Sequence, residues 1–240
     1  KTTDNCLMTW VKICGMTNLE DALLAVDVGA DAVGFVFYEK SPRCVTVETV
    51  REIVEKLPES VEKVGVFVGK TAETVREVTE KAGLTLAQIY PDFRDPLSIP
   101  TDSCLRGIRP RVIVALPASQ LQHNESDNPD LITGFRVSAE FRDRIAAVLL
   151  DSGSPGRPGG TGKEFDWQSV VPMTDLMGQI GMKLIVAGGL RPGNVQDAIE
   201  ILKPWGVDVV TGVEASPGKK DPEKVRAFVR AVREMDRKAS

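Results

Sequence analysis

Two residues at the ends of apolar runs have side chains that suit acid–base chemistry. Cys14 ends the run Val11–Cys14, and Asp151 directly follows the run Ala146–Leu150. A thiolate can remove a proton and a carboxylic acid can donate one, and partial desolvation would raise the pKa of that acid into a usable range. An aspartate after a strand also often caps a helix, and a free cysteine is often a buried small apolar residue. We expect Asp151 to be the acid, while these residues alone leave the role of Cys14 open.

Glycines near the end of the chain suit an anion such as a phosphate. Gly188 and Gly189 follow one apolar run, and Gly212 and Val213 follow the next. Glycines let backbone N–H groups approach an anion closely, and a helix N-terminus favours negative charge by about 0.3–1 kcal/mol. The segment Glu214–Lys220 has room for a short extra helical turn. We expect a phosphate site at these loops, and tight turns that bind no ligand are the alternative.

A second glycine-rich stretch, Ser152–Lys163, follows Asp151 and suits a flexible lid over a site. It is not a nucleotide-binding P-loop, because that motif requires glycine at Arg157 and serine or threonine at Glu164. Arg43, in the loop after an earlier apolar run, could bind a substrate carboxylate through two N–H groups. An ordinary solvated cation is the simpler explanation for Arg43.

Composition limits the class of protein. The 240 residues carry a net charge of −4 and show no basic stripe, which argues against nucleic-acid binding. No apolar run approaches the roughly 18 residues of a membrane span, and the first residues lack an apolar signal core, so we expect a cytoplasmic protein. Four dispersed cysteines and one histidine support neither a zinc site nor a disulfide framework.

Short apolar runs alternate with helical periodicity along the chain, which is typical of β–α units and a parallel sheet. Eight such units in 240 residues predict a single-domain (β/α)8 TIM barrel over residues 1–240, with residues 1–8 a possible N-terminal extension. A doubly wound open sheet is the alternative, but the turn after the first strand lacks its usual glycine pattern. The predicted strands are 10–16, 32–38, 64–68, 86–90, 112–116, 146–150, 183–187 and 207–211. The predicted helices are 19–28, 47–57, 71–82, 139–145, 192–202 and 222–235.

In these features the chain resembles the phosphoribosylanthranilate isomerase family of tryptophan biosynthesis. The matching segments follow the family's order and cover most of the sequence. They are Lys12–Asn18, Gly29–Phe37, Ser41–Arg43, Val64–Val68, Leu149–Asp151, Gly159–Lys163, Phe165–Trp167, Ala187–Leu190, Asn194–Val195, Val207–Asp208, Gly212–Glu214 and Pro217–Asp221.

The resemblance implies a (β/α)8 barrel without cofactor or metal that isomerises N-(5-phosphoribosyl)anthranilate by an Amadori rearrangement. Asp151 would protonate the furanose ring oxygen, and Cys14 would remove the C2′ proton. Arg43 would contact the anthranilate group, while the glycine loops would bind the phosphate. A monomer and a homodimer are both compatible with this assignment. Two alternatives stay open: another phosphosugar isomerase, and a catalytically silent barrel that binds phosphorylated ligands.

Two positions depart from the family pattern. The family usually has Gln-Leu-His-Gly at the end of the fourth strand, whereas this chain has Gln88-Ile-Tyr90-Pro91. One of the two serines before the last glycine is replaced by Val210, and Thr211 keeps the second hydroxyl. The stretch from Pro91 to Phe141 matches the family poorly.

Strand alternation makes one further prediction about the barrel interior. If Cys14 points inward, Lys12 does too, and Asp208 has the same parity on the last strand, which neighbours the first. We expect these two residues to form an ion pair, because each would otherwise be a costly buried charge. A separation of more than about 6 Å between the head groups would exclude the pair.

Overall fold

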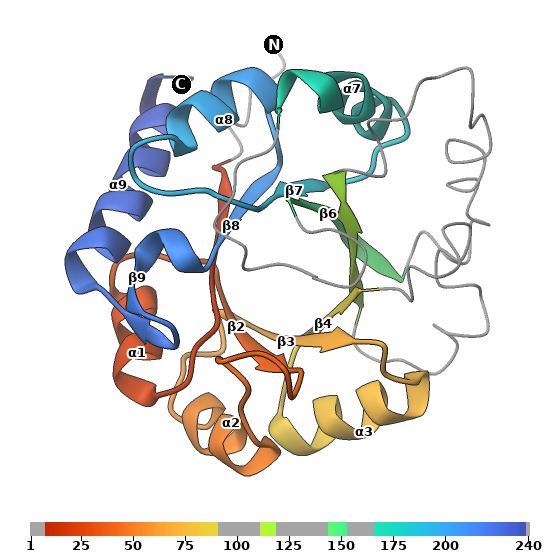
Figure 1. Cartoon of the computed structure of the whole chain (residues 1–240), viewed down its shortest axis with the longest axis vertical. Helices are drawn as coiled ribbons and strands as arrows, with labels where there is room; N and C mark the ends of the chain where they lie inside the picture. Colours follow the sequence, from red (N-terminus) through yellow and green to blue (C-terminus); the bar gives the residue numbers. More distant parts are fainter. Residues whose placement is uncertain (1–7, 91–110, 119–143, 153–165, 239–240) are drawn as a thin grey trace.

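Eight parallel strands close into a barrel at the centre of the molecule (Figure 1), as the sequence predicts. The structure, a computed structural model, describes residues 8–90, 111–118, 144–152 and 166–238. Each strand pairs with its sequence neighbour, and β1 also pairs with β8, which closes the ring. The strands are β1 (Trp10–Cys14), β2 (Ala32–Phe37), β3 (Glu62–Val68), β4 (Leu86–Tyr90), β5 (Val112–Pro117), β6 (Ile145–Asp151), β7 (Leu184–Val186) and β8 (Gly206–Val209).

The helices surround the barrel on the outside (Figure 1). Polar side chains fix several of their first turns: Asn18, for example, accepts a hydrogen bond from the backbone N–H of Asp21 at the start of the first helix. Gly83 ends the third helix with φ of +69°, the left-handed conformation that glycine adopts without strain. The α-helices are α1 (Leu19–Asp27), α2 (Val47–Val54), α3 (Ala72–Ala82), α7 (Val171–Gln179), α8 (Val195–Leu202) and α9 (Pro222–Lys238), with short 3-10 helices η2 (Gln168–Val170) and η3 (Thr211–Val213).

Apolar side chains fill two layers. The larger layer lies between the strands and the helices and includes Val11, Ile13 and Phe35, all fully buried. The smaller layer fills the barrel itself with residues such as Ala32 and Leu149. Because both faces of each strand are covered, the strands are nearly continuous apolar runs, and this pattern made them predictable.

Two parts of the chain differ from the expectation. The helix α7 was not predicted, because Pro172 and Gly178 lie within its nine residues and weaken the helical pattern. The segment after β8 does not form its short helix within Glu214–Lys220. The helical turn η3 precedes that segment, which instead forms an antiparallel hairpin of β9 (Glu214–Ser216) and β10 (Lys219–Lys220).

Other expectations fall on residues that the structure does not describe. These are the possible N-terminal extension apart from Met8, the glycine-rich lid apart from Ser152, and the stretch from Pro91 to Phe141 that matches the family poorly, apart from residues 111–118 with β5. Of the helix predicted at 139–145, the structure describes only Arg144 and Ile145. Arg144 lies in a turn and Ile145 begins β6, so the prediction that the helix extends to residue 145 is wrong. Among the described residues, no helix is long and apolar enough to cross a membrane.

Candidate active site

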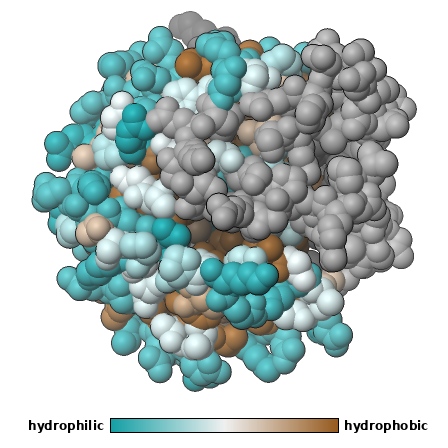
Figure 2. Space-filling model, in the orientation of Figure 1, coloured by the Kyte–Doolittle hydropathy of each residue, from teal (hydrophilic) through white to brown (hydrophobic). Residues whose placement is uncertain are grey.

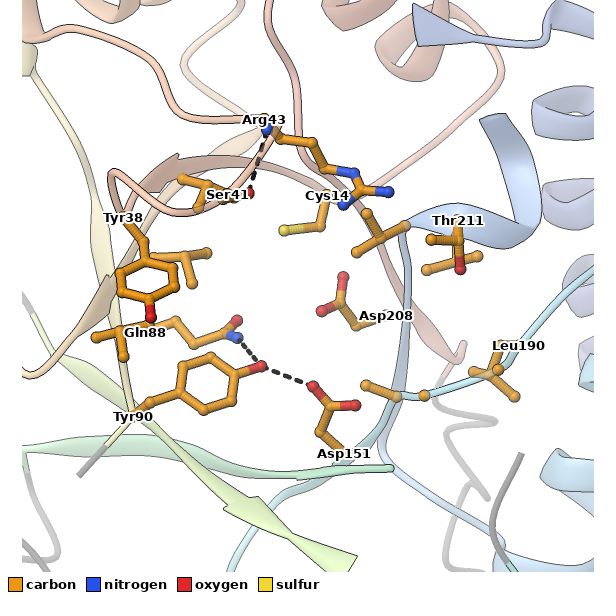
Figure 3. Close-up of a pocket in the computed structure, with 18 residues that line it drawn as sticks. Cys14, Tyr38, Ser41, Arg43, Gln88, Tyr90, Asp151, Leu190, Asp208 and Thr211 are labelled. Atoms are coloured by element: carbon orange, nitrogen blue, oxygen red, sulfur yellow. Dashed lines mark hydrogen bonds between the residues drawn. The ribbon is translucent and has the colours of Figure 1, made fainter. Parts of the chain in front are cut away.

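A pocket of about 720 Å³, including its open mouth, lies where the strands end. Figure 2 shows apolar side chains near the centre of one face of the molecule, with hydrophilic side chains beside them. Cys14 from β1 and Asp151 from β6 both line the pocket and point into it (Figure 3). The two residues predicted to carry acid–base chemistry are therefore brought together, although they lie 137 positions apart in the sequence.

The thiol of Cys14 is closely packed and 3% exposed. A Cβ atom at Gly34, the neighbouring residue on β2, would lie 2.5 Å from Sγ of Cys14 and 3.0 Å from Cε of Lys12. Only glycine at this position leaves room for both side chains. Burial raises the pKa of Cys14 and Asp208 raises it further, while the Lys12 ammonium opposes both effects. The resting group is therefore a thiol, which must lose its proton before it can act as a base.

The predicted ion pair inside the barrel is confirmed. Nζ of Lys12 lies 2.9 Å from Oδ2 of Asp208, and both side chains are buried. The register of β1 and β8 places the two residues directly opposite each other. Burial disfavours the charge on Lys12, but the Asp208 carboxylate opposes that penalty, and the pKa of the ammonium is raised. A fixed positive charge therefore stands beside the thiol.

The carboxyl group of Asp151 lies in a hydrogen-bonded row that crosses the barrel interior. The hydroxyl group of Tyr90 donates a hydrogen bond to Oδ2 of Asp151 over 2.8 Å. Gln88 donates to the oxygen of Tyr90 over 3.3 Å and accepts from Nζ of Lys12 over 2.9 Å. The row therefore connects Asp151 with the Lys12–Asp208 pair, and Figure 3 shows its Gln88–Tyr90–Asp151 end.

Arg43 lines the pocket but is already held by a carboxylate of the protein. Its Nε and Nη2 atoms donate to the two carboxylate oxygens of Glu214 over 2.8 and 2.6 Å. These two hydrogen bonds to Glu214 raise the pKa of Arg43 against the opposing effect of burial. Burial works against the charge of Glu214, yet Arg43 and Lys220 lower its pKa. Among the described residues Nη1 of Arg43 has no partner, so one corner of the guanidinium group is left for a ligand.

The glycine loops divide into two roles. Gly188 and Gly189, both with positive φ, line the pocket as expected for residues that present backbone N–H groups. Gly212 and Val213 are not among the lining residues. A Cβ atom at Gly212 would lie 1.9 Å from the carbonyl oxygen of Leu190, so this glycine lets the loops after β7 and β8 touch.

Several residues in the pocket or next to its lining were not assigned a role from the sequence. Gln88 is a buried polar residue on β4, and inward parity along that strand was the available signal. Glu214 lies in the hairpin, which was not predicted, so the sequence offered no such signal for it. Gly34 gave no signal, because a glycine inside a strand does not reveal which side chain would occupy its space. Lys220 donates to the backbone oxygen of Cys14 over 2.6 Å, a contact that depends on the hairpin.

Comparison with known proteins assigns the chain to a family. Residues 11–231 match the family model described as N-(5'phosphoribosyl)anthranilate (PRA) isomerase. A relative of that name from Thermotoga neapolitana is 44% identical over 93% of this chain and 98% of its own length. Another from Pelobacter propionicus is 41% identical over 95% of this chain and 97% of its own length.

Solved structures agree with the sequence matches. The crystal structure of phosphoribosyl anthranilate isomerase from Thermotoga maritima superposes with a TM-score of 0.76 at 40% identity, covering 95% of this chain and all of that one. A further structure of such an enzyme, in complex with reduced 1-(o-carboxyphenylamino)-1-deoxyribulose 5-phosphate, has a TM-score of 0.74 at 38% identity, with the same coverage of both chains. The chain therefore belongs to the phosphoribosylanthranilate isomerase family.

Proposed function

We propose that this protein isomerises N-(5-phosphoribosyl)anthranilate to 1-(2-carboxyphenylamino)-1-deoxyribulose 5-phosphate in tryptophan biosynthesis. The observation that carries the proposal is the placement of Cys14 and Asp151 in one pocket beside the Gly188–Gly189 loop. The pocket thus combines a base, an acid and a backbone suited to an anion. One of the two structural relatives above supports the same substrate class, because it holds a reduced form of that product.

Two proton transfers account for the reaction. Asp151 donates a proton to the furanose ring oxygen as the C1′–O bond breaks, which gives an open-chain Schiff base. Cys14, as the thiolate, then removes the C2′ proton, and the resulting enolamine tautomerises to the ketone. Each transfer contributes about 10²–10⁴ in rate. These steps only move protons, so the proposal includes neither a cofactor nor a metal.

Lys12 supports the role of Cys14. The thiolate is disfavoured by burial, and a neighbouring ammonium is the group that most directly favours it. Nζ of Lys12 is held by Asp208 and Gln88 and keeps its position beside Cys14 when the charge on sulfur changes. A preorganised charge of this kind stabilises the anion without rearrangement during the reaction.

The remaining site residues are proposed to bind the two ends of the substrate. Arg43 would contact the anthranilate carboxylate through Nη1, since its other donors are engaged by Glu214. The phosphate would lie at the loop of Gly188 and Gly189. Gly212 and Val213 would contribute to the phosphate site from the loop after β8, which touches the loop after β7 at Leu190.

The setting of the protein also remains a prediction. A cytoplasmic location and the absence of nucleic-acid partners rest on composition alone. Both a monomer and a homodimer remain in the proposal, and the related enzyme from Thermotoga maritima is described as dimeric in a structure of its engineered monomers.

Substrate turnover tests the proposed function directly. Substrate generated in place from anthranilate and phosphoribosyl pyrophosphate should lose its anthranilate-type fluorescence rapidly when the protein is added, and the ketone product should appear in equal amount. Tight binding of a product analogue without any turnover would instead support the silent phosphosugar-binding barrel. Turnover only of other phosphorylated aldoses would support another isomerase.

A further inference from the structure

Tyr90 occupies the end of β4 and lies inside the barrel, where it is 6% exposed. Its hydroxyl group lies 2.8 Å from Oδ2 of Asp151, the last residue of β6. The titratable groups that act on Tyr90 are Asp151 on β6, Asp208 on β8 and Cys14 on β1. Burial and these groups raise the pKa of Tyr90 well above its ordinary value, so the phenol stays protonated and remains a donor at neutral pH.

The direction of every hydrogen bond in this row follows from Lys12. An ammonium group can only donate, so the amide oxygen of Gln88 must face Nζ of Lys12, which lies 2.9 Å away. The amide nitrogen of Gln88 then faces Tyr90 and donates to its oxygen over 3.3 Å. The single phenolic proton of Tyr90 is thereby directed at Asp151.

This orientation favours one protonation state of Asp151. A carboxylate accepts hydrogen bonds only, whereas a protonated carboxyl group must place one donor of its own. A hydrogen bond to a charged acceptor is about twice as strong as one to a neutral acceptor. The contact from Tyr90 therefore strengthens when Asp151 gives up its proton.

We propose that Tyr90 is a positioning residue for the acid: its hydroxyl, oriented by Gln88 and Lys12, stabilises the carboxylate that Asp151 becomes as it protonates the substrate. The inference rests on the proposed function in its assignment of Asp151 as the acid. It gives a role to the tyrosine that replaces the family's usual histidine. It also couples the acid on β6 to the cation that stands beside Cys14.

The test compares Tyr90→Phe with the wild-type protein in two separate measurements. The first follows the side-chain carboxyl carbon of Asp151 by NMR as a function of pH, with the signal assigned through Asp151→Asn. Loss of a donor to the charged form should raise the pKa of Asp151 by about 1 to 2 pH units, the equivalent of one hydrogen bond to a charged group. This readout does not depend on turnover.

The second measurement is steady-state kinetics on the isomerisation. Tyr90→Phe should lower kcat about 10- to 100-fold and change KM by less than about 2-fold, because the lost interaction belongs to the transition state. Tyr90→His, which restores a ring N–H donor, should recover much of both the kcat and the pKa of Asp151. Gln88→Met should shift both quantities in the same direction as Tyr90→Phe, by less.

Tyr38→Phe is the matched control, because Tyr38 lines the same pocket and has no hydrogen bond to Asp151 among the described contacts. It should leave the pKa of Asp151 unchanged. A fall in kcat without a change in that pKa, or a changed pKa with full kcat, would overturn the role of Tyr90. The wild-type protein could fail to turn over the substrate while Tyr90→Phe still raises the pKa of Asp151. That result would contradict the proposed function and leave the Tyr90–Asp151 contact established.

Discussion

A buried thiol is a poor base until it loses its proton, and this requirement explains the surroundings of Cys14. Burial raises the pKa of the thiol, while Lys12 opposes that effect. The thiol therefore stays protonated at rest, and the ammonium group of Lys12 lies beside its sulfur. The residues that matter most for Cys14 are therefore those that fix its position relative to Lys12.

Gly34 is such a residue, and we predict that Gly34→Ala impairs catalysis. The new methyl group would lie 2.5 Å from Sγ of Cys14, so the thiol must move. A displacement of about 1 Å in a reacting group costs on the order of 100-fold in rate. Steady-state kinetics on the isomerisation would measure the loss of kcat/KM. Full activity in Gly34→Ala would show that the position of the thiol is not critical.

Part of the site was predictable at the residue scale. Cys14 and Asp151 were identified because each ends an apolar strand, and Lys12–Asp208 because strand parity and barrel closure together decide the contact. Tyr90's bond to Asp151 could not be predicted, since β4 and β6 are not neighbours and their distance across the interior depends on the closed barrel. The Arg43–Glu214 contact joins residues that lie 171 positions apart.

At the scale of elements, helix ends and loops position the site, and their glycines have different functions. Gly83 ends α3 with φ of +69°. Gly178 lies inside α7, has no positive φ and would meet no atom within 4 Å if it carried a Cβ atom. The first glycine is required by its conformation, and the second only weakens its helix.

We predict opposite effects of alanine at these two positions. Gly178→Ala should stabilise the protein by about 0.5–1 kcal/mol, because alanine loses less backbone entropy in a helix. Gly83→Ala should destabilise it by about 1 kcal/mol, since alanine is strained at positive φ. Denaturant unfolding would measure both free energies of unfolding. Equal effects of the two substitutions would contradict this account of the helix ends.

Gly178, together with Pro172, explains why α7 was not predicted whereas the strands were. The bounds of all eight barrel strands agree with the expectation to within two residues, because runs buried on both faces leave a clear pattern. The hairpin β9–β10 was also not predicted. It is held by tertiary contacts, among them the hydrogen bond from the backbone N–H of Lys220 to Asp21, and local sequence does not encode such contacts.

At the scale of the whole molecule, buried charges connect distant parts of the fold. Glu214 joins the hairpin to Arg43 in the loop after β2 and to Lys220. Its pKa is lowered from the ordinary value of 4.5, as Arg43 and Lys220 outweigh the effect of burial. A carboxyl group with a lowered folded-state pKa binds protons more weakly in the folded state than in the unfolded state. Its stabilisation is therefore present above about pH 4.5 and is lost as the pH falls through the folded-state pKa.

We predict that Glu214→Gln reduces this acid sensitivity. The variant should be less stable than the wild type at neutral pH, because Arg43 and Lys220 lose a buried counter-charge. Its free energy of unfolding should then fall less steeply below about pH 4.5 than that of the wild type. Urea unfolding at a series of pH values would measure both slopes, with Glu52→Gln on the exposed face of α2 as the control. Parallel curves for Glu214→Gln and the wild type would contradict the linkage.

We propose that Cys14 and Asp151, which lie in one barrel mouth, act as base and acid on the same substrate. Single-turnover decay of substrate fluorescence, with enzyme in excess, tests it most directly in the wild type, Cys14→Ser and Asp151→Asn. Each substitution should slow the decay by at least about 100-fold while a product analogue still binds. Wild-type decay in either variant would contradict the assignment of that residue.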